Sequence, residues 1–435
     1  MSMPFRFVSN LRPQSVPSFE RVGHRPQAWL LSSHRLDAAT EALAHAVRAA
    51  GLDLFADNGT KEAIDDFLDL FLARYVGVIE QIRQRGRALE PRGRVPRPNE
   101  VPADLRRTID DASEEVFAAV DERSKEVSAR DLLTLQLSMR PSHLIAKEDY
   151  AIGLLIGLGF EREWSRFRVE RFTRRNAITL DFWDEVASDA RVAAEGVAVY
   201  ATLGAMDYNT ARAAARLAAR RGVDRVAVGF AGVNLDVSFV SSYLAGGRRA
   251  LSGTAPRRYV RLAEIVAGMR DGYRDEKRKL VAFHGLGLGA LPQFPVLAAG
   301  FDPETEITVD ATSPLHDAVR DLVIYDERAR GERMTLLEAA NETVRGGEPA
   351  LGSPFFVSAR ERLGFDADAA RTWWRGQGER ALTVEDLDPE TPLGRALPIF
   401  STAKSAAGSS LTSVVRDAPD ARVGHNHWVA DAIAA

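Results

Sequence analysis

The 435-residue sequence contains no cysteine. Disulfide bonds, zinc sites with thiolate ligands, iron–sulfur clusters and a cysteine nucleophile are therefore excluded. An excess of either charge is lacking too, because 57 lysine and arginine residues stand against 61 aspartate and glutamate residues, for a net charge of −4. Without a global positive field, a nucleic-acid site would have to be a local basic patch. Only six of the basic residues are lysine, so phosphate contacts would be made mostly by arginine.

Long apolar runs are also missing. No stretch of 18 apolar residues occurs, and Met1–Arg12 lacks the apolar core of a signal peptide. We therefore expect a soluble, cytoplasmic protein without a membrane span. Hydrophobic residues at 45% and charged residues at 27% are ordinary values for a globular chain, and they exclude wholesale disorder, collagen and coiled coils.

Short apolar segments rich in β-branched residues recur along the chain, each followed by a longer helical stretch such as Lys61–Arg83 or Tyr208–Arg221. This alternation predicts βα units around a parallel sheet. The expected strands are Ala28–Leu31, Leu52–Ala56, Leu133–Leu137, Val197–Thr202, Val226–Gly229, Lys279–His284 and Ile307–Asp310. With room for an eighth strand, the pattern favours an α/β fold of the (β/α)8 TIM-barrel type. A doubly wound open sheet is the alternative.

Some segments depart from this alternation of strands and helices. Arg85–Asp104 and Ala245–Arg258 combine glycine and proline with several arginines, and we expect both to be basic surface loops. Towards the C-terminus the strand signals give way to helices and turns. We therefore expect residues 1–330 to form the barrel domain, with basic loop insertions near 85–104 and 245–258, and residues 331–435 to form a helical C-terminal extension.

Functional side chains of a (β/α)8 barrel lie at the C-terminal ends of its strands. Two of the expected strands end at an aspartate, Asp57 in one case and Asp310 in the other. A pair of aspartates at the barrel mouth can supply one nucleophile and one acid–base group for attack on a glycosidic carbon. Each aspartate is equally compatible with an ordinary helix N-cap.

Glycine-bearing turns follow three other expected strands, and glycine lets a flat ligand approach the backbone closely. The last of these turns, His284–Gly289, has a GLGLG spacing that does not fit dinucleotide binding, and it is compatible with a phosphate-gripping turn or a simple tight exit from the strand. His425 and His427 would lie on one face of an extended strand. No third ligand accompanies them, so the sequence predicts no metal site there.

Five segments follow one another in an order that carries a resemblance to a known family. They are Leu54–Thr60, Val197–Met206, Gly222–Gly232, Leu280–Gly287 and Thr308–Ala318. This order resembles the tRNA-guanine transglycosylase superfamily. There, an Asp-Ser-Gly-Gly segment supplies an acid–base aspartate, a base-binding turn and a Tyr-Ala-Ile-Gly-Gly strand follow, and a Phe-Asp-Cys-Val-x-Pro-Thr-Arg segment carries the nucleophile.

The resemblance implies a barrel enzyme in which Asp310 is the nucleophile and Asp57 is the general acid–base group. Asp149, in the segment Ser142–Asp149, corresponds to the aspartate that reads the guanine base. The other positions that the resemblance assigns to the substrate pocket are Gly204, Gly229, Gly232, Gly287 and His284.

The chain differs from the tRNA enzymes of this family in two features. The family's tRNA enzymes hold zinc with three cysteines and a histidine, whereas this chain has no cysteine, so no zinc cofactor is expected. The glutamine of the family's base-binding turn is also absent from Leu203–Met206. The related enzymes that insert 7-deazaguanines into DNA are therefore the closer comparison.

The expected function is that of a pentosyltransferase without a cofactor. It would replace guanine in nucleic acid, with DNA favoured over tRNA, by a 7-deazaguanine base through a covalent aspartyl-glycosyl intermediate. Phosphate contacts are expected from Arg248, Arg249, Arg257 and Arg258. A homodimer or helper proteins are compatible with this activity.

Two alternatives stay open at this point. One is a barrel enzyme acting on a small phosphorylated or sugar substrate, with His284–Gly289 gripping the phosphate. The other is a nucleic-acid-binding component without catalytic activity. The sequence also leaves open which polymer is the substrate and which 7-deazaguanine enters.

Overall fold

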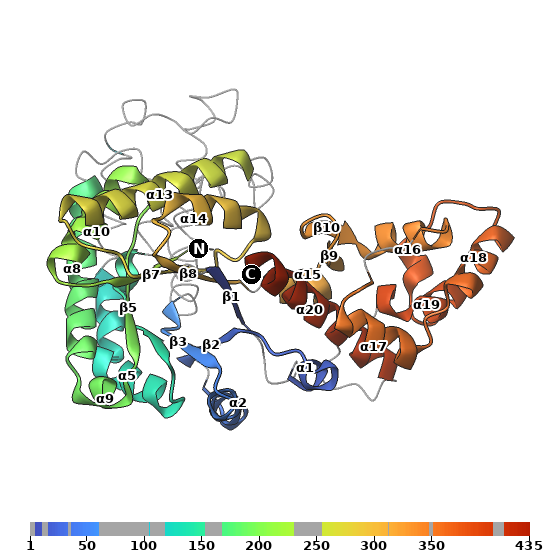
Figure 1. Cartoon of the computed structure of the whole chain (residues 1–435), viewed down its shortest axis with the longest axis horizontal. Helices are drawn as coiled ribbons and strands as arrows, with labels where there is room; N and C mark the ends of the chain where they lie inside the picture. Colours follow the sequence, from blue (N-terminus) through green and yellow to red (C-terminus); the bar gives the residue numbers. More distant parts are fainter. Residues whose placement is uncertain are drawn as a thin grey trace. The chain divides into compact units, whose positions relative to one another are not determined.

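Eight strands close into a barrel in which neighbouring strands follow the order of the chain (Figure 1). This computed structural model describes residues 5–10, 16–33, 36–60, 104, 118–152, 168–229, 255–311, 313–347, 351–402 and 413–435, apart from the side chains of residues 17–18, 168, 255–258 and 413–417. The barrel strands are β1 (Phe5–Ser9), β2 (Ala28–Ser32), β3 (Asp53–Asp57), β4 (His143–Ile145), β5 (Ala198–Thr202), β6 (Arg225–Gly229), β7 (Ala282–Leu286) and β8 (Glu306–Ala311). The pairings within β1–β2 and from β3 through β8 are parallel.

Helices alternate with these strands along the chain. They are α1 (Val16–Val22), α2 (Ala38–Ala49), α5 (Ala129–Ser138), α8 (Arg168–Ala187), α9 (Ala190–Glu195), α10 (Tyr208–Arg220), α13 (Ala255–Asp275), α14 (Phe294–Gly300) and α15 (Ser313–Val319). The predicted (β/α)8 TIM-type fold is thereby confirmed, and the doubly wound open sheet is excluded.

The chain after β8 adds a small sheet and further helices, so the predicted helical C-terminal region is also confirmed. The two-stranded antiparallel sheet pairs β9 (Val323–Asp326) with β10 (Glu332–Thr335) and was not expected. The helices are α16 (Leu336–Val344), α17 (Pro354–Leu363), α18 (Ala367–Gly376), α19 (Pro392–Ala396) and α20 (Ser413–Ala434).

The described chain forms two compact units. The first contains Leu31–Leu288 and Pro292–Val309, and the second contains Phe5–Leu30, Gly289–Leu291 and Asp310–Ala435. The sequence-based boundary between residues 330 and 331 stays a prediction. In the observed grouping, the C-terminal helices share a unit with the first barrel strand.

Six of the seven expected strands are present, each within three residues of its expected position. The seventh, Leu133–Leu137, is wrong because it lies inside α5. Ser128 and Asp131 form a capping box at the start of this helix, and Leu133, Gln136 and Leu137 are buried at helical spacing. The strand that is present in this region is β4, which was not predicted and is only three residues long. The first strand, β1, was also missed.

Two further expectations need correction. His425 and His427 lie in α20 and not on an extended strand. Residues 255–258 begin α13 and are not part of a loop, since a proline at position 256 is tolerated in the first turn of a helix. The expected helix Lys61–Arg83 lies outside the described residues. So does the segment 85–104, apart from Asp104, and so do residues 245–254.

An aromatic layer fills the barrel at the level of β3, β4, β5 and β7. The Phe55 ring stacks on His143 at 4.2 Å and on His284 at 5.0 Å between ring centroids, and the Tyr200 ring lies within 6.2 Å of all three. Side chains of a barrel strand point alternately inward and outward. Because these four rings come from four strands and touch one another, they must lie on the inner face of the barrel.

Helix α20 holds the backbone of the second unit together through buried polar side chains. Asn426 accepts a hydrogen bond from the Tyr325 N–H and donates to the carbonyls of Pro314 and Val323. Arg422, fully buried, donates to the carbonyls of Ala318, Ile399 and Ser401. Since unpaired buried carbonyls are costly, α15, β9 and the segment near residue 400 depend on this helix.

None of the described helices combines the length and the apolarity that crossing a bilayer requires.

Acidification is expected to weaken the second unit through two buried histidines. Burial lowers the pKa of His425 to about 4 and that of His427 to about 3, from an ordinary value of 6.5. Below pH 6.5 the unfolded chain therefore binds more protons than the folded one, and stability is lost as the pH falls. At pH 5 each histidine should account for a loss on the order of 2 kcal/mol.

Urea unfolding of the wild type and of His427→Leu at pH 7.5 and pH 5.0 measures this effect. The variant should lose about 2 kcal/mol less than the wild type between the two pH values, because it has one titrating group fewer. Equal losses in the two proteins would contradict the role given to His427.

Candidate active site at the carboxyl ends of the barrel strands

Asp57 and Asp310 each occupy the last inward-facing position of a barrel strand. Asp57 follows Phe55 by two residues on β3, and Phe55 belongs to the inner aromatic layer. Asp310 follows Thr308 by two residues on β8, and the Thr308 hydroxyl lies 2.8 Å from Nδ1 of His284, a member of the same layer. Residues two apart on a strand share a face, so both carboxylates belong to the inner face of their strands at the C-terminal end.

The ends of β3, β4 and β5 are tied together by Asn58. Its side-chain amide donates to the Ala146 carbonyl at 3.0 Å and to the Thr202 hydroxyl at 3.5 Å, and its oxygen accepts from the Thr60 N–H at 3.1 Å. Asn58 is 4% exposed. The turn that carries Asp57 is therefore held in one conformation against the neighbouring strand ends.

Asp57 is held through its backbone and its side chain. The Ser33 hydroxyl donates to the Asp57 carbonyl at 2.7 Å, and an Asp57 carboxylate oxygen accepts from the Asn58 N–H at 2.8 Å. Neither contact is an N-cap of a described helix, although the chain beyond Thr60 lies outside the described residues.

Asp310 is held by the turn that follows β7. The Gly289 N–H donates to the Asp310 carbonyl at 2.8 Å. A Cβ atom at position 289 would lie 2.8 Å from that same carbonyl and 2.8 Å from the Phe7 ring, which is too close for any side chain. Glycine is therefore required at position 289 for packing against the Asp310 backbone. Asp310 itself is 5% exposed.

The loop after β4 presents three ionisable side chains in a row, and the two outer ones are anchored. Lys147, 2% exposed, donates to the carbonyls of Ser124 and Val127. Asp149, also 2% exposed, accepts from the Ala151 N–H and pairs with Arg175 at 3.3 Å. Glu148 lies between these two anchored residues and remains partly exposed.

Among the described residues at this end of the barrel, Glu148 has a strongly altered ionisation. The pKa of Glu148 is raised from 4.5 to about 8, chiefly by burial; the Thr60 side chain acts in the opposite direction, and the neighbouring carboxylates of Asp57 and Asp149 contribute to the rise. Glu148 therefore carries a proton at neutral pH while Asp57 stands beside it. Strongly shifted carboxyl groups of this kind gather at catalytic sites.

The sequence did not single out Glu148. A signal was available, because Glu148 follows the Leu144–Ile145 segment just as Asp57 follows its strand. The strand β4 was missed, and the position after it was therefore not considered as a strand end.

Asp149, which is expected to read a base, contacts α8 and a neighbouring arginine. Arg175 donates both to Asp149 and to Asp121, the latter at 2.7 Å. The Asp149 N–H donates to the Thr179 hydroxyl, which ties the loop to α8. Burial raises the pKa of Asp149, and the Arg175 charge opposes that rise. These contacts make Asp149 an anchor of the loop that carries Glu148.

The predicted pocket residues have different surroundings. The N–H and carbonyl of Gly204 are bonded to the Asn176 side chain, at 2.9 Å and 3.0 Å, and Ile152 packs where a side chain would be. At Gly229 no described residue lies within 4 Å of the position that a Cβ atom would take. Gly287 has a φ of 69°, the left-handed conformation that favours glycine. His284 is fully buried in the aromatic layer. Gly232 lies outside the described residues.

The four arginines predicted to contact phosphate have side chains outside the described part of the structure. Arg248 and Arg249 lie outside the described residues, and the side chains of Arg257 and Arg258 are not described although their backbone begins α13. Within the described part of the chain, no three histidine, aspartate or glutamate side chains are grouped to hold a metal ion.

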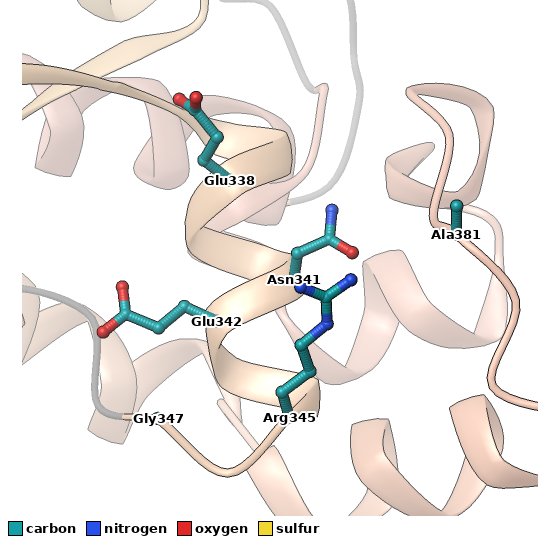
Figure 2. A pocket seen from close by; sticks show the side chains of 6 residues that line it. All are labelled: Glu338, Asn341, Glu342, Arg345, Gly347 and Ala381. Atoms are coloured by element: carbon teal, nitrogen blue, oxygen red, sulfur yellow. The ribbon is translucent and has the colours of Figure 1, made fainter.

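A depression of about 560 Å³ lies on the C-terminal unit (Figure 2). Helix α16 and the turn after it supply most of its lining, opposite Ala381. The lining residues are Glu338, Asn341, Glu342, Arg345, Gly347 and Ala381. None of the predicted site residues lines it. Its charges are mixed, and Glu342 lies 3.5 Å from the Arg328 guanidinium, so the depression has no chemistry that points to a ligand.

No family model matches the chain, and a search of curated proteins gives no match either. The indications of function lie in the barrel and in the side chains at its strand ends.

Gly204→Ala is expected to destabilise the protein, because the added methyl group would overlap the Ile152 side chain. Overpacking of this kind costs about 1–3 kcal/mol. Urea unfolding of Gly204→Ala, Ile152→Ala and the double variant forms a cycle that tests the contact. Gly204→Ala should cost less when Ile152 has been shortened, and an unchanged cost would show that the two positions are not in contact.

Glu148→Gln is expected to change how stability depends on pH. The folded-state pKa of Glu148 is raised, so its contribution to stability is present below the ordinary value of 4.5 and is lost as the pH rises towards 8. Glutamine does not ionise in this pH range, so the variant lacks this pH-dependent loss of stability. Relative to the wild type, the variant should gain on the order of 1–3 kcal/mol between pH 5 and pH 7.5.

Urea unfolding at these two pH values measures the gain. The matched control is Glu195→Gln, since Glu195 is an exposed residue at the end of α9 and should show no such gain. Identical pH dependence in Glu148→Gln and the wild type would show that Glu148 ionises at an ordinary pH.

Proposed function

We propose that this protein is a base-exchange transglycosylase that replaces guanine in nucleic acid, DNA in preference to tRNA, by a 7-deazaguanine. The observation that carries the proposal is the position of Asp57 and Asp310, each the last inward-facing residue of a strand in a closed parallel barrel. Functional groups of this fold lie at that end of the barrel. The order of segments along the chain, with its resemblance to the transglycosylase superfamily, supports the same activity.

In the proposed reaction, the Asp310 carboxylate attacks C1′ of the target nucleotide. The bond from C1′ to guanine breaks, and guanine leaves with the bonding electrons while an ester forms between Asp310 and the sugar. A 7-deazaguanine then enters, Asp57 takes the proton from its attacking nitrogen, and the new bond to C1′ releases Asp310. Two displacements restore the original configuration at C1′, and neither requires a redox group or a metal ion.

The surroundings of His284 argue against a phosphate contact by its side chain. His284 is fully buried, stacks on Phe55 and lies 2.8 Å from the Thr308 hydroxyl. A side chain packed in the barrel core in this way cannot reach a phosphate at the surface. The same burial argues against the substrate contact that the resemblance assigns to His284, so it does not distinguish base exchange from the alternative.

Asp310→Asn tests the proposal most directly. Wild-type protein incubated with DNA or tRNA and a labelled 7-deazaguanine should incorporate the label, as measured by mass spectrometry of the released nucleosides. Asp310→Asn should lower incorporation by at least about 10³-fold, because the amide cannot form the covalent intermediate. Wild type should also form a covalent adduct with the nucleic acid in the absence of incoming base.

Asp57→Asn should slow incorporation by about 10²-fold to 10⁴-fold, since it removes the acid–base group. It should still form the covalent adduct. Circular dichroism of both variants controls for folding. An Asp310→Asn protein that incorporates label at the wild-type rate would overturn the mechanism, and a wild type that incorporates none into either polymer would overturn the function.

A further inference from the structure

We propose that α1 is a pH-sensitive cover for the buried imidazole of His427, closed at neutral pH and released when that imidazole takes up a proton. The inference concerns the second compact unit alone, which contains α1, α17 and α20. It does not depend on the transglycosylase activity proposed above.

Contacts between aromatic rings join α1 to the rest of the second unit. The Phe19 ring of α1 lies 4.8 Å from the Phe355 ring of α17 and 6.0 Å from the His427 ring of α20, measured between ring centroids. It lies 6.4 Å from the Trp29 ring of β2. Because α1 is only seven residues long, it is not stable on its own in water, and its position depends on these contacts.

His24 supplies the polar part of the contact between α1 and α20. It follows the end of α1 by two residues, and its Nε2 atom lies 3.1 Å from the Oδ2 atom of Asp431. Asp431 follows His427 by four residues on α20, so the two side chains share one face of the helix. The contact therefore contains two imidazoles and one carboxylate.

His427 is buried without a hydrogen-bond partner among the described residues. It is 0% exposed, the rings of Phe7 and Phe19 lie within 6.0 Å of its own, and neither of its ring nitrogens is bonded to a described residue. A protonated imidazole has two N–H donors, and a buried charge without partners is strongly destabilising. Burial accordingly lowers the pKa of His427 to about 3, and the charge of His24 acts in the same direction. In the closed arrangement His427 is therefore neutral.

A single carboxylate serves both imidazoles. Asp431 is bonded to His24, so a protonated His427 would share it, and the buried contact would hold two positive charges against one negative charge. Among the described residues, His24 is the one whose charge acts on both His427 and Asp431. Protonation of His427 therefore disfavours the closed arrangement.

The other charged groups on the elements packed against α20 are directed elsewhere. Asp317 of α15 bonds to Tyr325 and Arg333, and Asp326 of β9 bonds to Arg328. Arg6 of β1 and His316 of α15 are half-buried, and neither acts on the pKa of His427. The remaining ones are exposed, namely Glu20 and Arg21 of α1 and Arg360, Glu361 and Arg362 of α17.

Release of α1 opens His427 to water, where the pKa of the imidazole returns to its ordinary value of 6.5. The closed arrangement is therefore at full stability above pH 6.5 and loses stability as the pH falls below that value. Between pH 7.5 and pH 5.0 the equilibrium constant for release should rise about 30-fold. Burial raises the pKa of Asp431, which favours the closed arrangement at low pH, so the effect is assigned to His427 and not to Asp431.

Amide hydrogen exchange in the full-length protein measures the release. The readout is the protection of the backbone amides of residues 20–23, corrected for the intrinsic effect of pH on exchange, at pH 7.5 and pH 5.0. Protection in the wild type should fall about 30-fold between these pH values. In His427→Leu it should fall less than about threefold, because leucine takes up no proton. His427→Gln, a polar replacement that does not ionise, should behave like His427→Leu.

Two controls separate release of α1 from other effects of acid. Asp431→Asn removes the partner of His24 but leaves His427 able to titrate, so the fall in protection should persist from a lower starting value. Dilute urea distinguishes release from unfolding of the unit, since exchange through a local opening is almost independent of urea and exchange through unfolding increases with it. At pH 5.0 the amides of residues 20–23 should show the first behaviour and those of α16 the second.

Three results would overturn the inference. Equal falls in protection for the wild type and both His427 variants would show that His427 does not control α1. A pH dependence that is lost in Asp431→Asn and kept in the His427 variants would assign the effect to the bond between His24 and Asp431. Exchange of residues 20–23 with the same urea dependence as α16 would show that α1 leaves only when the whole unit unfolds.

Discussion

The stacking of Phe55 against His143 and His284 determines which side chains face the inside of the barrel. Three rings from β3, β4 and β7 can touch only inside the barrel, and their contact fixes which residues of each strand point inward. Because residues two apart on a strand share a face, the inward-facing rings also identify which residues at the strand ends point inward. Asp57 lies inward because Phe55 does, and Asp310 lies inward because Thr308 reaches His284.

Polar groups at the strand ends are costly to bury unless they are hydrogen-bonded, and two amide side chains supply hydrogen bonds here. Asn58 links three strand ends through hydrogen bonds that would otherwise require water, and Gln136 of α5 donates to the carbonyls of both Ala56 and Ile145. These amide side chains carry no charge. They keep the strand ends together without neutralising the carboxyl groups beside them, which is what allows Glu148 to differ so strongly in ionisation from an exposed glutamate.

The fold was largely predictable from the sequence because a parallel barrel repeats one simple pattern. Apolar segments followed by amphipathic helices identified six barrel strands, and with them the two aspartates at strand ends. The periodic pattern does not distinguish helix from strand where a segment is short or buried. Leu133–Leu137 is as apolar as a strand, yet the Ser128–Asp131 capping box begins a helix there, and the true strand β4 is too short to be distinguished by periodicity.

The candidate site was predictable in part for the same reason. A carboxylate directly after a long apolar strand is visible in the sequence, as Asp57 and Asp310 are. Glu148 was not found, because its pKa depends on burial and on the carboxylates of Asp57 and Asp149, and nothing in the local sequence reveals those neighbours. The same holds for Gly204, where the reason for glycine is the Ile152 side chain more than fifty residues earlier in the chain.

The large separation in sequence between α20 and β1 has a consequence for biosynthesis. Its Asn426 and Arg422 side chains complete the hydrogen bonding of α15 and β9, and His427 lies against Phe7 of the first barrel strand, with 5.9 Å between ring centroids. A domain folds as it emerges from the ribosome only if its partners have already been made. Here a ring of the first barrel strand packs against a helix that is translated long after it, so the second unit cannot complete its packing until α20 has been made.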